Sequence, residues 1–210
     1  MVSGLVLVAA VYWASNKGPT KLMRETPRTA IADFSGKKSA KLIGHLHYLG
    51  EPLVAPISGR PCAYYSVSIE RNSVGRPAET LSEESKGVAF EIVDGTGRIV
   101  VDPAAATVLV VLDSHTKSGF LNSPTESQLK YLETREVDCQ NSMGYEELVY
   151  HEGVLEEGEY VVALGHGTME TDLNPSNQGK RGYRDGPVSR WRMQGHAKKP
   201  LMISDDIRTL

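Results

Sequence analysis

Histidines and cysteines are the residue types in this chain that could most readily perform chemistry. His45 and His47 are two residues apart. On a β-strand both rings would therefore lie on one face, where a metal ion could bridge them. The spacing of the other histidines nominates no third ligand, and polar alternation on an exposed strand explains the pair equally well. We predict no metal site and no cofactor.

Cys62 is a candidate nucleophile, with a histidine as its base, so a thiol enzyme or hydrolase is one hypothesis. No histidine stands in a recognisable catalytic signature, however. A cysteine that opens a β-strand is more often a small buried hydrophobic residue. Cys139 has no stronger signature, and two cysteines cannot form a disulfide scaffold or a four-thiolate zinc site. We predict no catalytic residue.

Charge is distributed unevenly along the chain. Residues 133–159 hold nine acidic side chains against one basic, and residues 180–199 hold seven basic against one acidic. Such patches steer charged partners, unless neighbouring strands pair them with each other. Arginine and tryptophan are frequent energetic anchors of interfaces, so the candidate partner-binding residues are Arg190, Trp191 and Arg192. The formal net charge of −3 argues against a nucleic-acid partner.

The first fifteen residues are almost entirely apolar. Their uncharged run, residues 2–14, is shorter than the roughly 20 residues of a spanning helix, so a signal peptide and a buried element are alternatives to a membrane anchor. Tyr12 and Trp13, with Lys17 behind them, resemble a membrane-interface belt. We predict an anchor at 1–15, short or truncated, that contacts lipids. The excess of basic residues in 16–41 then predicts a domain on the cytoplasmic side.

The elements that follow are mostly strands. Apolar or alternating patterns predict strands at 41–48, 62–71, 88–93, 98–101, 107–112, 145–155, 160–164, 188–193 and 201–204. Residues 94–97, Asp-Gly-Thr-Gly, predict a hairpin turn. Ser123 as N-cap and Pro124 predict a helix to about residue 133. The polar stretches 72–86 and 168–187 are predicted loops.

These elements predict a mostly β, α+β fold: a strongly bent antiparallel sheet or partly open barrel with one or two short helices. After the anchor we expect a basic linker at 16–28 and one folded domain at 29–210.

Four segments resemble the GIDE domain family: 50–65 (GEPLVAPISGRPCAYY), 90–102 (FEIVDGTGRIVVD), 151–165 (HEGVLEEGEYVVALG) and 200–205 (PLMISD). The resemblance implies a domain beside a membrane, as in membrane-embedded RING ubiquitin ligases, where it is thought to contact substrates. The glycines of these segments, Gly59, Gly95, Gly97, Gly153 and Gly158, are plausible turn positions. The family supplies no catalytic residue to transfer.

The chain departs from the ligase pattern because a RING finger needs paired cysteine and histidine ligands for zinc, and two cysteines cannot supply them. The leading hypothesis is a membrane-anchored GIDE-like interaction module that binds a protein partner beside the membrane. One alternative is a component or remnant of a ubiquitin-transferase system that works with a separate RING protein. The thiol enzyme centred on Cys62 is the other.

Overall fold

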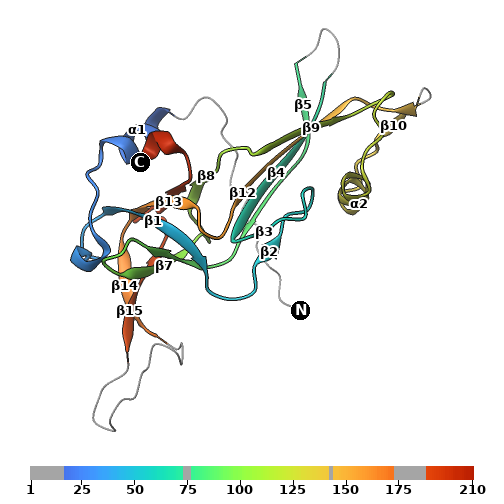
Figure 1. The fold of residues 1–210 in the computed structure, drawn as a ribbon. Coiled ribbons are helices and arrows are strands. Elements are labelled where there is room, and N and C mark those ends of the chain that lie inside the picture. The colour runs from blue at the N-terminus through green and yellow to red at the C-terminus, as the bar shows by residue number, and fades with distance from the viewer. Residues whose placement is uncertain (1–16, 73–76, 142–143, 173–187) are drawn as a thin grey trace.

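The computed structural model describes residues 17–72, 77–141, 144–172 and 188–210. Within these residues the chain is mostly β-structure, in one large sheet, one smaller sheet and two short hairpin sheets (Figure 1). The strand orders are open, so neither of the two larger sheets closes into a barrel. The prediction of a mostly β fold with one or two short helices is confirmed for the described residues.

The large sheet has the order β14-β15-β7-β6-β1-β13-β16-β8. Its strands are β1 (Ala40–Tyr48), β6 (Phe90–Val93), β7 (Arg98–Asp102), β8 (Thr107–Leu109), β13 (Tyr160–Gly165), β14 (Gly167–Thr171), β15 (Ser189–Gln194) and β16 (Met202–Ser204). Central β1 pairs antiparallel with β13 and β6. β15 pairs parallel with β7, and β16 with β8. The large sheet therefore departs from the predicted antiparallel pairing at two places, where distant segments run alongside β7 and β8 in the same direction.

The first half of β1 is buried on both faces. Leu42 and Leu46 belong to the main core of the large sheet, whereas Ile43 packs on the opposite face with Met23 of helix α1 (Lys17–Glu25). Since side chains alternate along a strand, the uninterrupted burial of Lys41–Gly44 reflects coverage on both sides, whereas His45 and His47, on the Ile43 face, are exposed. The short helix η1 (Ile31–Asp33) adds Ile31 to the main core.

The smaller sheet is antiparallel throughout, in the order β5-β4-β12-β9. Its strands are β4 (Tyr64–Arg71), β5 (Glu79–Gly87), β9 (Ser114–Ser118) and β12 (Leu148–Leu155). Helix α2 (Glu126–Thr134) contributes Tyr131 and Leu132 to a second core with this sheet. The short strands β2 (Leu53–Val54), β3 (Pro61–Cys62), β10 (Gln140–Asn141) and β11 (Gly144–Tyr145) form the two hairpin sheets.

The paired strands β4 and β12 join the two sheets. Tyr64 and Leu155, which face each other in register, belong to the main core, while Val67 and Tyr150 belong to the second. One strand pair therefore supports both cores, and the segments around its Leu155 end meet at the junction between the sheets.

Two predicted elements differ in the structure. Within the predicted basic linker at 16–28, Lys17–Glu25 forms helix α1 and buries Met23 completely. Residues 72–86 are not a continuous loop, because Glu79–Gly87 forms edge strand β5. The side chains of β5 are mostly polar and do not alternate with apolar ones, so no strand pattern is visible in the sequence. The strand forms because its backbone pairs with β4, and this pairing requires no apolar side chains.

The helix at 124–133 is confirmed with a different start. Thr125, not Ser123, is the N-cap: its hydroxyl accepts the backbone N–H of Gln128, whose side chain returns a bond to the Thr125 N–H. This reciprocal capping box satisfies two otherwise orphaned donors. Of the predicted loop at 168–187, residues up to Thr171 belong to β14, and 173–187 lie outside the described residues.

Candidate functional site

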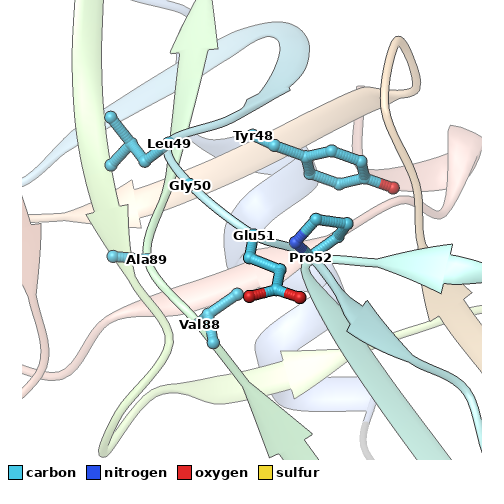
Figure 2. A pocket seen from close by; sticks show the side chains of 7 residues that line it. All are labelled: Tyr48, Leu49, Gly50, Glu51, Pro52, Val88 and Ala89. Carbon is cyan, nitrogen blue, oxygen red and sulfur yellow. The ribbon is translucent and has the colours of Figure 1, made fainter.

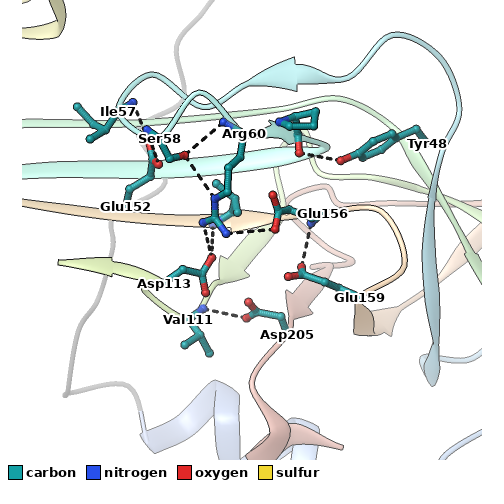
Figure 3. A network of polar contacts seen from close by, with 12 residues as sticks. Tyr48, Ile57, Ser58, Arg60, Val111, Asp113, Glu152, Glu156, Glu159 and Asp205 are labelled. Carbon is teal, nitrogen blue, oxygen red and sulfur yellow. Dashed lines mark hydrogen bonds and ion pairs between the residues drawn. The ribbon is translucent and has the colours of Figure 1, made fainter. Parts of the chain in front are cut away.

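Three of the four motif segments, 50–65, 151–165 and 200–205, meet at the junction between the two sheets. Arg60 donates to Asp113 at 2.9 Å and to Glu156 at 3.1 Å (Figure 3). The carboxylates around this guanidinium come from the β8–β9 connection, from β12 and the turn after it, and from the end of β16. We name this set the junction cluster: Arg60, Asp113, Glu152, Glu156, Glu159 and Asp205. It places one cation among five carboxylates.

Glu152 holds the turn between β2 and β3. Its side chain lies inside the protein and accepts the backbone N–H groups of Ile57 at 2.8 Å and Ser58 at 3.0 Å (Figure 3). The residue is 1% exposed. A carboxylate that accepts two backbone N–H groups acts as a local cap, so Glu152 positions the loop that carries Arg60.

Asp205 and Glu159 are the members whose protonation the fold alters. Burial raises the pKa of Asp205 to about 7, and the nearby Glu159 and Asp113 add to this rise, although the Val111 N–H donates to Asp205 at 2.8 Å. Burial also raises the pKa of Glu159, although its carboxylate accepts the N–H of Glu156. The cluster is thus an acidic site in which a carboxyl titrates near neutral pH.

We expect stability to fall as pH rises through this range. The folded-state pKa of Asp205 exceeds its ordinary value of 3.8, so its contribution is complete below about pH 4 and is lost as pH approaches 7, at up to about 1.4 kcal/mol per pH unit. Asp205→Asn keeps the acceptor for Val111 and removes this slope. Urea unfolding of both proteins at about pH 5 and about pH 8 measures the difference. Equal slopes in the two proteins would contradict the assignment.

Cys62 lies beside this cluster, at the end of β3. Burial raises the pKa of Cys62 to about 11, and Glu152 and Glu156 add to the rise. Reactive cysteines require the opposite surroundings, because the thiolate is the nucleophile. No described histidine forms a hydrogen bond with Cys62, which is fully buried in the second core. These surroundings favour the packing interpretation of Cys62.

A shallow pocket of about 230 Å³ adjoins the junction (Figure 2). Its lining contains one charged side chain, that of Glu51, and consists of Tyr48, Leu49, Gly50, Glu51, Pro52, Val88 and Ala89. Pockets for small organic ligands usually exceed roughly 300 Å³. The size and sparse polarity of this pocket do not assign it a ligand.

The strand histidines bind separate partners. His45 contacts the carbonyl of Gly158 at 2.9 Å through Nδ1, and His47 contacts the Glu157 carboxylate at 2.7 Å. Across β9 and β12, His115 and His151 approach each other at 3.1 Å between their Nδ1 atoms. In the part of the chain that the structure describes, no group of three histidine, cysteine or acidic residues could hold a metal ion.

The predicted binding residues on β15 are engaged within the large sheet. Glu170 accepts Nε of Arg190 at 2.7 Å and Nε of Arg192 at 2.6 Å, and Arg192 also donates to Asp102 at 3.2 Å. Trp191 packs edge-on against Phe34, with ring centroids 5.4 Å apart. The arginines therefore pair with strands β14 and β7 of their own sheet, not with the acidic stretch 133–159.

The structure reveals a different exposed feature, at the end of β9. Gly119 and Asn122 exchange backbone hydrogen bonds of 2.8 and 3.1 Å, which places Phe120 and Leu121 at the centre of a tight turn. These side chains are 75% and 94% exposed. Turn centres usually carry glycine, asparagine or aspartate, so two large apolar residues there are unusual. We name residues 119–122 the apolar turn.

A recess of about 930 Å³ adjoins the apolar turn. It is lined by Lys117, Ser118, Gly119, Phe120, Leu121, Asn122, Tyr145, Glu146 and Glu147. Sequence analysis missed this surface, although a signal was present. Phe120 and Leu121 stand between a glycine and an asparagine, which are turn residues, rather than inside an apolar run.

Of the three predicted membrane-interface residues, Lys17 alone is among the residues that the structure describes. Tyr12 and Trp13, with the whole anchor at 1–15, lie outside the described residues. Lys17 is the first residue of α1. Among the residues described, no helix has the length and apolar character needed to cross a bilayer.

Comparisons with protein-family models, with curated proteins and with solved structures each give no significant match.

Proposed function

We propose that this chain is a membrane-anchored interaction module of the GIDE type that binds a protein partner through the apolar turn. The observation that carries the proposal is the exposure of Phe120 and Leu121 on a turn closed by two backbone hydrogen bonds. An apolar pair on a rigid support loses little conformational entropy on binding, so it suits the anchor of an interface.

Charge around the apolar turn indicates the chemistry of the partner. Glu147 lines the adjoining recess and forms no ion pair with a described residue, whereas Glu146 is paired with Arg71. Helix α2 and the segment after it add exposed carboxylates at Glu133, Glu136 and Asp138. Lys117 is the one cation of the recess lining. We infer a protein partner with an apolar hollow and a basic rim.

The membrane part of the proposal comes from the sequence. The apolar residues 1–15 would anchor the chain, and the basic residues after them favour a domain on the cytoplasmic side. In Figure 1, α1 lies at one end of the molecule while α2 and β10 lie at the other. A module anchored ahead of α1 would therefore present the α2 end away from the bilayer.

We expect the double variant Phe120→Ser/Leu121→Ser to lose partner binding by about thirtyfold, the scale of a two-residue hot spot, while stability stays within about 0.5 kcal/mol. A photo-cross-linking residue in place of Leu121, in the full-length chain, identifies the partner in cells. The purified partner is then titrated against wild type and variant, at low and high salt. Charge complementarity predicts weaker binding at high salt.

Met169→Ser is the matched control, because Met169 is also an exposed apolar side chain but lies on β14 of the large sheet. It should leave partner affinity unchanged. Equal affinity of the double variant and wild type would contradict the proposal, as would cross-links from position 121 to lipid alone. A captured partner that carries RING zinc ligands would place the module in a ligase assembly.

A further inference from the structure

A second recess, of about 560 Å³, lies on the α1 side of the large sheet. Apart from Tyr160, every ionisable side chain in its lining is cationic. We name it the basic recess, and its lining is Arg24, Thr26, Pro27, Arg28, Lys41, Ile43, Tyr160 and Leu210. Figure 1 shows α1 beside the C-terminal helix η3 (Ile207–Thr209), and these two elements frame the site.

Lys41 is a buried cation of the basic recess with no carboxylate partner among the described residues. It is 3% exposed, and its Nζ donates to the carbonyls of Met23 at 3.0 Å and Thr209 at 2.9 Å. An ammonium group has three donors, so these carbonyls leave one unassigned. Burial lowers the pKa of Lys41, which reflects the cost of an uncompensated charge. An anion in the recess would reduce that cost.

The two arginines bring further positive charge to the opening. Arg24 is exposed and forms no ion pair with any described residue. The backbone of Arg28 forms a β-bridge with that of Lys41. The Arg28 guanidinium pairs with the Asp94 carboxylate at a long nitrogen–oxygen distance of 3.7 Å. The recess thus combines a buried ammonium with two guanidinium groups, a donor set that suits phosphate oxygens.

We propose that the basic recess binds the phosphate group of an anionic membrane lipid. Helix α1 begins three residues after the apolar run 2–14, so an anchored chain would hold this face at the bilayer. Exposed apolar side chains lie on the same elements: Leu22 on α1, Ile207 on η3 and Leu210 directly after η3, and Leu210 also lines the recess. Apolar groups that flank basic groups match the boundary between acyl chains and headgroups. The lipid source of the phosphate rests on the proposed function, and the donor set does not.

The test uses the full-length chain in phosphatidylcholine nanodiscs that contain or lack phosphatidylglycerol. Amide hydrogen exchange is followed at residues 24–28 and 207–210. We expect phosphatidylglycerol to slow exchange at these residues in the wild type. Arg24→Glu changes the charge by two units. It should lower the affinity of the recess for phosphatidylglycerol by about 25-fold, at about 1 kcal/mol for each charge.

Lys38→Glu is the matched control, because it makes the same charge change at an exposed position outside the recess lining. It should retain the protection that Arg24→Glu loses. Equal loss in both variants would overturn the site in favour of general attraction to the surface, and no effect of phosphatidylglycerol would also overturn it. If soluble glycerol phosphate, added to nanodiscs of neutral lipid, slows amide exchange as much as phosphatidylglycerol does, a membrane lipid is not the source of the phosphate.

A separate experiment tests the anchor by measuring whether the full-length chain co-floats with neutral vesicles. If the chain does not float with them, the anchor is refuted. Flotation with phosphatidylglycerol vesicles that Arg24→Glu abolishes and Lys38→Glu retains would still support the recess. If the chain floats with neither kind of vesicle, the anchor and the lipid-phosphate site are both refuted, while partner binding at the apolar turn is tested by its own titration.

Discussion

Glu152→Ala is expected to lower the free energy of unfolding by about 3 kcal/mol, because each of the two hydrogen bonds that its carboxylate accepts contributes about 1.5 kcal/mol or more. The variant leaves the N–H groups of Ile57 and Ser58 without their acceptor, at 2.8 and 3.0 Å in the wild type. It also removes one of the carboxylates that surround Arg60. Urea unfolding monitored by circular dichroism measures the loss.

Two further variants separate the causes of this loss. Glu152→Gln keeps one acceptor oxygen and should lose an intermediate amount. Glu147→Ala removes an exposed carboxylate that forms no ion pair with a described residue, so its free energy of unfolding should stay within about 0.5 kcal/mol of wild type. An unfolding free energy of Glu152→Ala equal to that of Glu147→Ala would show that Glu152 does not hold the β2–β3 turn.

Gly153→Ala is expected to cost about 3 kcal/mol, at the upper end of overpacking effects. A Cβ atom at this position would lie 2.5 Å from the backbone oxygen of Val111 and 3.0 Å from a methyl group of Val110. Because the nearest atom belongs to the backbone, the segment between β8 and β9 would have to move. That segment ends at Asp113, whose N–H donates to the Glu152 carbonyl at 3.0 Å.

Gly50→Ala is the matched control. Gly50 has no atom within 4 Å of an added Cβ and lacks a positive φ. Its replacement should be neutral or stabilise the fold by up to about 1 kcal/mol, since alanine reduces the entropy of the unfolded chain. The two variants are compared by urea unfolding. Similar stabilities for both would show that residues 110–113 do not press against β12.

These variants probe how the junction cluster is assembled, whereas partner binding and lipid binding are proposed at opposite ends of the molecule. Arg60 joins the β2–β3 turn to the two connections that run between the sheets, at Asp113 and at Glu156. We therefore expect Glu152→Ala and Gly153→Ala to lower stability without removing a binding contact. The apolar-turn and Arg24 variants should do the reverse.

Local patterns determined most of the elements. Asp-Gly-Thr-Gly at 94–97 predicted the hairpin of β6 and β7, and positive φ at Gly59, Gly95 and Gly158 confirms three of the predicted turn glycines. Gly153 was wrongly placed in a turn. It lies within β12 and allows the close approach of Val110 and Val111, which are distant in the chain, so the sequence carries no local signal for this contact.

The candidate sites could be predicted less well, because they depend on contacts between distant segments. Arg190, Trp191 and Arg192 have the residue types of an interface, but strands β14 and β7 and the side chain of Phe34 engage them. Phe120 and Leu121 have the types of a core, but a two-residue turn exposes them. Residue type therefore indicated what these side chains could do, whereas tertiary packing decided which contacts they make within the fold.

A mostly β chain, a capped helix and several glycine turns were predictable from local patterns, because each arises from interactions over a few residues, and the charge asymmetry is read directly from the composition. Long-range contacts produce the two parallel pairings, the strand β5, and the gathering of Arg60 with five carboxylates at the junction, two of which bind it directly. They also form the basic recess from α1, β1, β13 and the C-terminal residues. Each of these features joins segments far apart in the chain, so the long-range packing of two cores selects them rather than local preference.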